Sequence, residues 1–376
     1  MTIQKMNNQI QLSAAAAVLA VTALMLVCVP GSADKALGFS LTAEQIEVLA
    51  PPVIPASKPV DVTWVEDNAI KIDGDLSDWP SDAGPLPTAY KDADDLSATA
   101  YLAVSASDFY MACDVTDDFY NMHGYGENMW EYDSVQFAID PLCRRTVGRY
   151  GDYDQEIGFC LFLDEPLVWR WQRPFGMPGE KVPGAQLAVN LSEGKAVYEA
   201  RIPIQQLWPL RPELGWPCGF SYLVNDRDDS RDREGFAAWA SGIGAGKDPS
   251  AFGVLNFPSD RIPSSTAVAA RFLTPQDPTP STQPQKWTCD IYAAHAGTVT
   301  IECTGSVEHG EAKGSRIWAQ ASFDVPKGVS SWHLSADLRK FAPHRTKVIP
   351  SVTLDGAAAA PCHPFTVYVY EPAGEH

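Results

Sequence analysis

Short runs of apolar or alternating residues recur along the chain between residues 98 and 240. Each run has the length of a β-strand and is closed by turn-forming residues, and no 3.6-residue periodicity lasts long enough for a long helix. The spacing predicts an antiparallel β-sandwich with one helical turn at Ile204–Trp208. The predicted strands are Ala98–Val104, Phe109–Val115, Ser134–Ile139, Ile157–Leu163, Gln186–Leu191, Ala196–Ile202, Gly219–Val224 and Gly235–Ala240.

The same pattern resumes after residue 286 and predicts a second, smaller immunoglobulin-like β-sandwich. Its strands are expected at Trp287–Tyr292, Thr298–Cys303, Arg316–Phe323, Ser331–Leu338, Val348–Leu354 and Phe365–Tyr370. The composition agrees, because 30 prolines, 27 glycines and 11 tryptophans favour turn-rich β structure over helix bundles. The predicted fold class is therefore all-β.

Two proline-rich stretches divide the chain. Residues 34–59 are rich in Ala and Pro and poor in aromatic residues, which predicts a tether. Prolines also interrupt every candidate strand in residues 259–286, which predicts a linker. We therefore expect the two folded domains at residues 60–258 and 287–376.

The first 33 residues have the pattern of a secretory signal peptide. Lys5 supplies the positive start, Ser13 to Val29 form the apolar stretch, and Gly31-Ser32-Ala33 is a small-residue cleavage site. A membrane anchor is the alternative, but the apolar run has only 17 residues and ends at Pro30. We expect export to the periplasm, the cell surface or the medium, with no transmembrane domain in the mature chain.

The charge of the chain limits its partners. The formal net charge is −19, with 28 Lys and Arg against 47 Asp and Glu. Because binding nucleic acid requires clustered cations that neutralise phosphates, we expect no nucleic-acid partner. Sugars remain open as ligands, since aromatic faces and hydrogen bonds hold them.

The cysteines give a redox prediction. Seven follow the signal segment, so at least one thiol stays free, and no C-x-x-C pair supports a zinc site. Cys289 and Cys303 flank Ala294–Gly297 at equal distance. If that segment is a hairpin turn, the two face each other across the strands and form a disulfide in an oxidising compartment.

Several segments of the first domain resemble the family 9 carbohydrate-binding modules in order and spacing. The most specific is Trp130–Asp140, which fits W-x-x-D-S-V-x-x-x-x-D. The others are the opening Ile72–Trp79, the strands Asp108–Asp117, Tyr198–Pro203 and Val224–Asp226, and the closing Lys247–Leu255 with its D-P-S-x-F-G-x-L pattern. The resemblance implies a non-catalytic β-sandwich that grips a sugar or glycan end between two tryptophan faces.

The resemblance also implies candidate ligand-binding residues. Trp130 matches one of the two tryptophans, but Gly246 stands at the place of the other. Gln136 replaces a carboxylate and would still hydrogen-bond a hydroxyl, and Gly158 stands near an expected arginine. Trp169 and Trp171 are substitutes for the missing face, because residues two apart point to one side of a strand.

The segment Asn225–Asp229 offers the oxygen ligands that Ca²⁺ takes, with Asp226 and Asp228 as candidate ligands. Related modules can hold structural calcium. The alternative is that Arg227, Arg231 and Arg233 pair with these carboxylates. Related sandwiches can also bind haem through Met or His, and the candidates for this alternative are Met111, Met122, Met129 and His123.

Catalytic motifs are missing from the sequence. There is no G-x-S-x-G, H-E-x-x-H or nucleotide-binding loop, so we expect no enzyme, although paired carboxylates of a glycoside hydrolase leave no motif. Two alternatives to sugar binding stay open: a sandwich that has lost sugar binding and acts as a structural or protein-interaction module, and an accessory or catalytic protein of polysaccharide breakdown.

Overall fold

A computed structural model describes residues 58–88, 95–228, 235–244, 246–273, 279–280, 284–306, 315–336, 345–358 and 362–370. The predicted signal peptide and nearly all of the predicted tether lie outside these residues. Within them the protein consists of β-strands and short 3-10 helices, so the all-β prediction is confirmed. Among the described residues, no helix is both long and apolar enough to cross a membrane.

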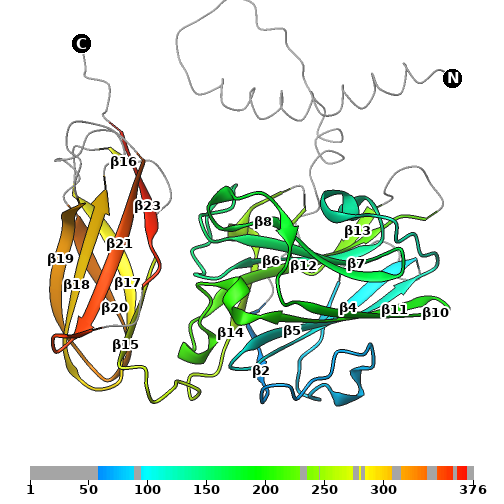
Figure 1. Ribbon diagram of the computed structural model, residues 1–376, viewed down its shortest axis with the longest axis horizontal. Helices are drawn as coiled ribbons and strands as arrows, with labels where there is room; N and C mark the ends of the chain where they lie inside the picture. Colours follow the sequence, from blue (N-terminus) through cyan, green and yellow to red (C-terminus); the bar gives the residue numbers. More distant parts are fainter. Residues whose placement is uncertain are drawn as a thin grey trace, which may run out of the picture. The chain divides into compact units, whose positions relative to one another are not determined.

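The first sandwich is built from two largely antiparallel sheets that are layered in Figure 1. One sheet has the order β1-β14-β12-β6-β7-β8-β9, with β13 paired to β12. Its strands are β1 (Val60–Asp61), β14 (Gly253–Asn256), β12 (Cys218–Asp226), β6 (Ser134–Asp140), β7 (Gln155–Phe162), β8 (Glu165–Gln172), β9 (Glu180–Lys181) and β13 (Gly235–Ala238). We call it sheet A.

The second sheet, sheet B, has the order β10-β11-β5-β4-β2, with β3 paired to β4. Its strands are β10 (Gln186–Ser192), β11 (Lys195–Pro203), β5 (Asp108–Asp117), β4 (Leu96–Val104), β2 (Thr63–Trp64) and β3 (Leu86–Pro87). Phe109 of sheet B meets Phe137 and Phe220 of sheet A, with ring centroids 6.0 and 6.3 Å away. These aromatic contacts join the two sheets into one core.

Sheet A is also covered on its outer face. Every residue of β6 and β12 is buried, whereas a strand with one face in water alternates. Loop segments supply the cover. They include the 3-10 helices η2 (Gly126–Glu131) and η6 (Pro249–Ala251). The remaining 3-10 helices of the described residues are η1 (Leu76–Asp78), η3 (Pro174–Gly176), η4 (Ile204–Leu207) and η5 (Pro212–Leu214). Small apolar clusters pack beneath this cover.

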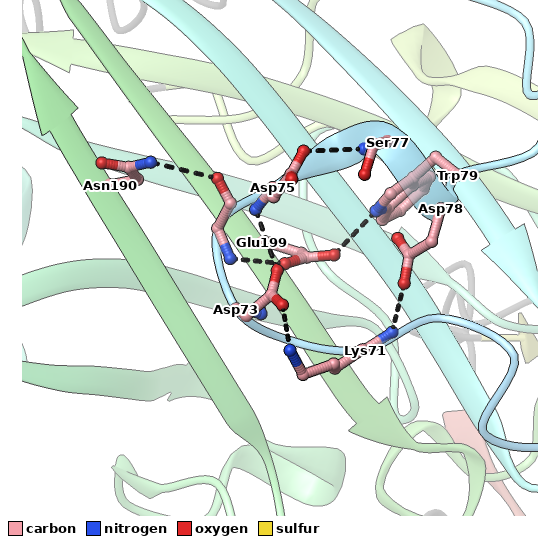
Figure 2. A network of polar contacts seen from close by, with 9 residues as sticks. Lys71, Asp73, Asp75, Ser77, Asp78, Trp79, Asn190 and Glu199 are labelled. Carbon is pink, nitrogen blue, oxygen red and sulfur yellow. Dashed lines mark hydrogen bonds and ion pairs between the residues drawn. The ribbon is translucent and has the colours of Figure 1, made fainter.

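One buried carboxylate attaches the opening motif, Ile72–Trp79, to β11 of the first sandwich. Glu199 of β11 accepts hydrogen bonds from the backbone N–H groups of Asp73 and Gly74 at 2.8 and 2.7 Å. It also accepts one from the indole N–H of Trp79 at 2.8 Å, as Figure 2 shows. Burial raises the pKa of Glu199, and the three hydrogen bonds oppose this shift.

A glycine is required at residue 74 for two reasons. Its φ is +81°, in the left-handed region that favours glycine. A Cβ atom there would also lie 3.0 Å from the Cβ of Asn190. The turn at Gly74 therefore brings the backbone N–H groups of Asp73 and Gly74 within hydrogen-bonding distance of Glu199.

The second sandwich has a three-stranded sheet, β15-β17-β20, and a sheet with the order β16-β23-β21-β18-β19 to which β22 adds. The strands are β15 (Val268–Phe272), β17 (Gln285–Ala293), β20 (Gly328–Ala336), β16 (Thr279–Pro280), β23 (Phe365–Tyr370), β21 (Arg345–Leu354), β18 (Gly297–Ser306), β19 (Ser315–Val325) and β22 (Ala357–Ala358). A buried apolar cluster lies between them. The prediction of a second, smaller β-sandwich is confirmed.

The predicted linker contains more structure than expected. β15 lies within residues 259–286 and pairs along its whole length with β17, although prolines surround it. The second sandwich therefore begins before residue 287, because the prolines flank β15 without interrupting it, and Pro280 itself lies in β16, which pairs with β23. The division into two folding domains stays a prediction.

The hairpin expected between Cys289 and Cys303 is wrong. β17 pairs with β15 and β20, and β18 pairs with β19 and β21, so the chain crosses from one sheet to the other. Both cysteines are recorded as free thiols, and both are buried in the same core cluster. A disulfide between them stays a prediction that the hairpin geometry no longer supports.

We expect Glu199→Ala to lower the free energy of unfolding by about 3 kcal/mol, because it leaves three donors without their acceptor. Urea denaturation of the full chain measures the change. Glu193→Ala is the matched control, since Glu193 is exposed in a turn and should shift stability by less than about 0.5 kcal/mol. Equal effects of the two substitutions would contradict the role given to Glu199.

Candidate functional site

Two tryptophans of β8 point to the outer face of sheet A. Trp169 and Trp171 both pack against a small cluster of Met129, Cys160 and Leu167. Arg170 between them points the other way, and its guanidinium donates to Gln155 Oε1 at 2.8 Å. The prediction that both indoles lie on one side of the strand is therefore confirmed.

Gly158 of β7 leaves the space that Trp171 occupies. A Cβ atom at residue 158 would lie 2.4 Å from the Trp171 indole and 2.6 Å from the Met129 sulfur. The indole N–H of Trp171 also donates to the carbonyl oxygen of Glu127 at 2.9 Å. Trp171 is thus fixed between sheet A and η2. Its indole lies against Gly158, near which the resemblance implied an arginine.

Trp130 lies on η2 and is 42% exposed. The end of this helix is fastened to β6, because the hydroxyl of Ser134 donates to the carbonyl oxygen of Met129 at 2.9 Å. Trp130 thus belongs to the same short helix whose other residues contact Trp171. The predicted aromatic residues Trp130 and Trp171 are held by one loop.

A pocket of about 330 Å³ opens beside Trp171 on this face. It is lined by Trp171 and Gln172 of β8, Glu156 of β7, the loop residues Gly148, Arg149 and Tyr150, and Lys247. One wall is thus aromatic and the others carry polar or charged groups. This combination suits a small polar ligand with an apolar face.

Glu156 is the buried polar centre of this pocket. It is 2% exposed, accepts a hydrogen bond from the Tyr150 hydroxyl at 2.7 Å, and forms an ion pair with Lys247. Burial, together with the Glu156 charge, raises the pKa of Tyr150 well above its usual value. The phenol therefore stays protonated and keeps donating.

A larger cavity, of about 480 Å³, lies near β8 and β10. Its lining is mostly aliphatic, with Val168, Val182 and Leu187 beside Lys181. It lacks both an aromatic face and a carboxylate among its lining residues. The smaller pocket therefore has the more suitable chemistry for binding a sugar.

Of the four predicted ligand residues, Trp130 lies on η2 and the other three lie in three further places. Trp171 lines the pocket, whereas Trp169 packs under Tyr125 with ring centroids 6.2 Å apart. Gln136 is only 3% exposed, next to Gly158 across the strands. Gly246 is exposed beside Lys247.

Sequence reasoning missed Glu156, Tyr150 and Lys247 as pocket residues. Glu156 and Lys247 are 91 positions apart, so their pairing has no local signal. The available signal was that Lys247 begins the closing motif Lys247–Leu255 and that Glu156 lies two residues before Gly158, where the resemblance implied an arginine.

Carboxylates from three segments, one of them a strand of sheet B, lie close together. Asp117 of β5 and the predicted pair Asp226 and Asp228 place carboxylate oxygens within 4.8 Å of one another. Asp133 lies close by and accepts hydrogen bonds from the backbone N–H groups of Asn121 and Arg227, the latter at 2.7 Å. We call these four residues the acidic cluster.

Burial and mutual repulsion disfavour the charges in the acidic cluster. Burial, followed by the charge of Asp133, raises the pKa of Asp117 to about 8. Burial raises the pKa of Asp133 to about 7, although two backbone hydrogen bonds oppose the shift. Carboxylates held this closely, in a place that penalises their charge, fit a divalent cation with oxygen ligands.

Three arginines, Arg227, Arg231 and Arg233, were the alternative partners of these carboxylates. Arg231 and Arg233 lie outside the described residues. The guanidinium of Arg227 stacks on the ring of Tyr132 at 4.2 Å from the centroid, and it donates to the carbonyl oxygen of Glu131 at 3.3 Å.

The sequence profile of a family described as "Carbohydrate family 9 binding domain-like" matches residues 72–259, half of the chain. A comparison with curated proteins gave no match. The family assignment therefore rests on the profile match.

Solved structures similar to this chain include a carbohydrate binding module family 9 from Caldicellulosiruptor kristjanssonii in complex with cellotriose. It is 20% identical, with a TM-score of 0.40 over 56% of this chain and 97% of that one. The glucose complex of a module from the same organism is 19% identical, with a TM-score of 0.40 over 56% and 98%. A putative carbohydrate-binding protein from Bacteroides uniformis is 14% identical, with a TM-score of 0.39 over 54% and 99%.

We expect Gly158→Ala to displace Trp171, because the added methyl group overlaps the indole. Overpacking of this kind costs about 1–3 kcal/mol, which urea denaturation measures, and the displaced indole should change the tryptophan emission. Gly84→Ala is the control, since nothing lies within 4 Å of its Cβ position. If Gly158→Ala matched this control in both measurements, the packing described for Trp171 would be incorrect.

Proposed function

The chain belongs to the carbohydrate family 9 binding domain-like family, and we propose that its first sandwich binds the end of a sugar chain in the pocket beside Trp171. The observation that carries this proposal is the pocket itself. An aromatic wall stands there beside a buried carboxylate whose phenol and ammonium partners can also reach a ligand.

The pocket residues offer two complementary interactions to a pyranose. The ring of Trp171 supports packing of the sugar's C–H groups on its electron-rich face. Around it, Glu156 can accept hydrogen bonds from hydroxyls, while Tyr150, Lys247 and Gln172 can donate to ring or hydroxyl oxygens. Trp130, exposed on the loop that holds Trp171, supplies a second aromatic surface.

We propose that this binding is non-catalytic. Hydrolysis of a glycosidic bond needs two carboxylates that flank it. Among the described residues that line the pocket, Glu156 is the one carboxylate, and it is already engaged by Lys247 and Tyr150. A single carboxylate in this lining does not provide the pair that hydrolysis needs.

A structural or protein-interaction module is the second candidate function. The observation that favours it is the exposed Gly246, where the family's second tryptophan was expected. Titration with sugars distinguishes the two candidate functions, because a purely structural or protein-interaction module would bind no sugar in the pocket.

We also propose export of the mature chain after removal of residues 1–33. The apolar segment and the small-residue site at Gly31-Ser32-Ala33 support it. N-terminal sequencing of the protein from culture medium, periplasm and cells tests this proposal.

We further propose that the acidic cluster binds a structural Ca²⁺ ion. The approach of Asp117, Asp226 and Asp228 supports it, and Asp133 lies three residues after Trp130. A cation there would neutralise the buried carboxylates and fasten the segment that follows η2.

We expect Trp171→Ala and Trp130→Ala to weaken sugar binding at least about tenfold, because each removes an aromatic contact surface. Calorimetric titration of the full chain with glucose, xylose, cellobiose and cellotriose measures the affinity. Trp208→Ala is the matched control, because Trp208 is 40% exposed but belongs neither to the pocket lining nor to η2, the helix that contacts Trp171. Binding that survives both Trp171→Ala and Trp130→Ala would place the ligand elsewhere.

We expect Ca²⁺ to raise the unfolding temperature at pH 8, and chelation to lower it. Saturation at 100 times Kd adds about 2.7 kcal/mol. Asp226→Asn should abolish the response, whereas Asp164→Asn, at an exposed turn position, should keep it. An unchanged response in Asp226→Asn would contradict the assigned ligand.

The stability of the metal-free protein should also depend on pH. Asp117 and Asp133 have raised pKa values in the folded state, so their protonated forms favour folding and this stability is lost as pH rises from about 4 to 8. Thermal unfolding with chelator at pH 5 and pH 8 measures it. Calcium should stabilise more at pH 8 than at pH 5, because protons compete for the same oxygens.

A further inference from the structure

The segment 148–156 carries pocket residues at both of its ends. Its first three residues line the pocket, and so does Glu156 at its far end. The hydroxyl of Tyr150 donates to Glu156 at 2.7 Å and so joins the two ends. Residues 151–154 lie between these ends, and we call them the tip. The position of the tip therefore bears on the shape of the pocket.

The tip is a tight turn with a fixed backbone. The backbone N–H of Gly151 donates to the carboxylate of Asp154 at 2.5 Å. The backbone N–H of Asp154 donates back to the carbonyl oxygen of Gly151 at 3.3 Å. Asp152 and Tyr153 stand between these two hydrogen-bonded residues.

These two residues of the tip bind the second sandwich, and both sandwiches belong to one compact unit of the chain. The hydroxyl of Tyr153 donates to the carbonyl oxygen of Pro364 at 2.5 Å. The backbone N–H of Thr366 donates to the carboxylate of Asp152 at 3.2 Å. Thr366 lies in β23 and Pro364 directly precedes that strand. The tip is therefore docked on the start of β23.

The ring of Tyr153 is fully buried at this contact. It packs edge-on against His363 of the second sandwich, with ring centroids 5.5 Å apart. The Nε2 atom of His363 accepts a hydrogen bond from the backbone N–H of Phe272 in β15 at 3.3 Å. Burial lowers the pKa of His363 to about 3, so the ring stays neutral and can accept this bond. Through His363, Tyr153 is also held against β15.

The chain that follows β8 reaches the same contact. Gln172, the last residue of β8, lines the pocket. Three residues later, the backbone N–H of Phe175 donates to the carbonyl oxygen of Asp152 at 2.7 Å, and its ring lies 5.5 Å from the ammonium nitrogen of Lys347 in β21. Two segments that line the pocket thus meet the second sandwich just beyond their lining residues.

We propose that Asp152 and Tyr153 are positioning residues for sugar binding, which hold the pocket segment in its binding shape by docking on the second sandwich. This inference rests on the proposed function, because it assumes that sugar binds beside Trp171. Coupling between two sites is reciprocal. Bound sugar should therefore oppose release of the tip from β23, without changing the structure of the second sandwich.

Hydrogen–deuterium exchange of the full chain tests this coupling, measured by NMR with each of the four sugars titrated above. The backbone N–H of Thr366 is the reporter, because its acceptor is Asp152 of the tip. If sugar binds only while the tip is docked, saturation at 100 times Kd slows this exchange by up to about a hundredfold. We expect at least about tenfold slowing at Thr366 and less than about twofold at Ile301, in the middle of β18.

A matched pair of substitutions tests the positioning role. Tyr153→Phe keeps the ring but removes the hydroxyl that binds Pro364, and it should lower sugar affinity at least about threefold and speed exchange at Thr366. Tyr370→Phe removes a hydroxyl from a 45% exposed residue of the same strand, β23, and should change neither. The exchange measurement on the unaltered chain stands even if Tyr153→Phe does not fold.

Four outcomes would overturn the inference. Sugar that binds by calorimetry without slowing exchange at Thr366 would reject it and keep the proposed function. Equal slowing at Thr366 and Ile301 would show that the chain opens as a whole, which rejects a coupling through the tip. Unchanged affinity in a folded Tyr153→Phe would leave the contact with a structural role alone. Binding of none of the four sugars would reject the proposed function together with the inference.

Discussion

The candidate site depends on the missing side chain at residue 158. Because Gly158 presents no Cβ, the indole of Trp171 lies directly against β7 and reaches Met129 of η2. The same indole binds the Glu127 carbonyl, so one residue joins sheet A to the loop that carries Trp130. A larger residue at 158 would remove the aromatic wall of the pocket and release this loop.

The surrounding fold explains why such an arrangement can be stable. Sheet A is buried on both faces along β6 and β12, so the loops on its outer face pack as a third layer. Lys247 is fixed in this layer by the hydrogen bonds of Asp248 and faces Glu156. The ion pair of Lys247 and Glu156 lies next to Gly246, where the resemblance implied the family's second tryptophan.

The sequence was sufficient to predict most strands but not every neighbour. The alternation of apolar residues located the strands, and the spacing of Trp169 and Trp171 gave their common face. The separation of β17 and β18 into different sheets was missed, because a short turn between two strands predicts a hairpin unless long-range pairing is known. Asp117 was missed as a neighbour of Asp226 for the same reason: they come from different sheets, and only folding brings them together.

The central claim is that sugar contacts Trp171. Nuclear magnetic resonance of the ¹⁵N-labelled chain tests it most directly, because each tryptophan indole N–H gives its own signal and Trp171→Phe identifies that of residue 171. The account predicts that a bound glycan end shifts the Trp171 signal and leaves that of Trp287, buried in the second sandwich, unchanged. Saturating sugar that shifts other indole signals but not that of Trp171 would contradict it.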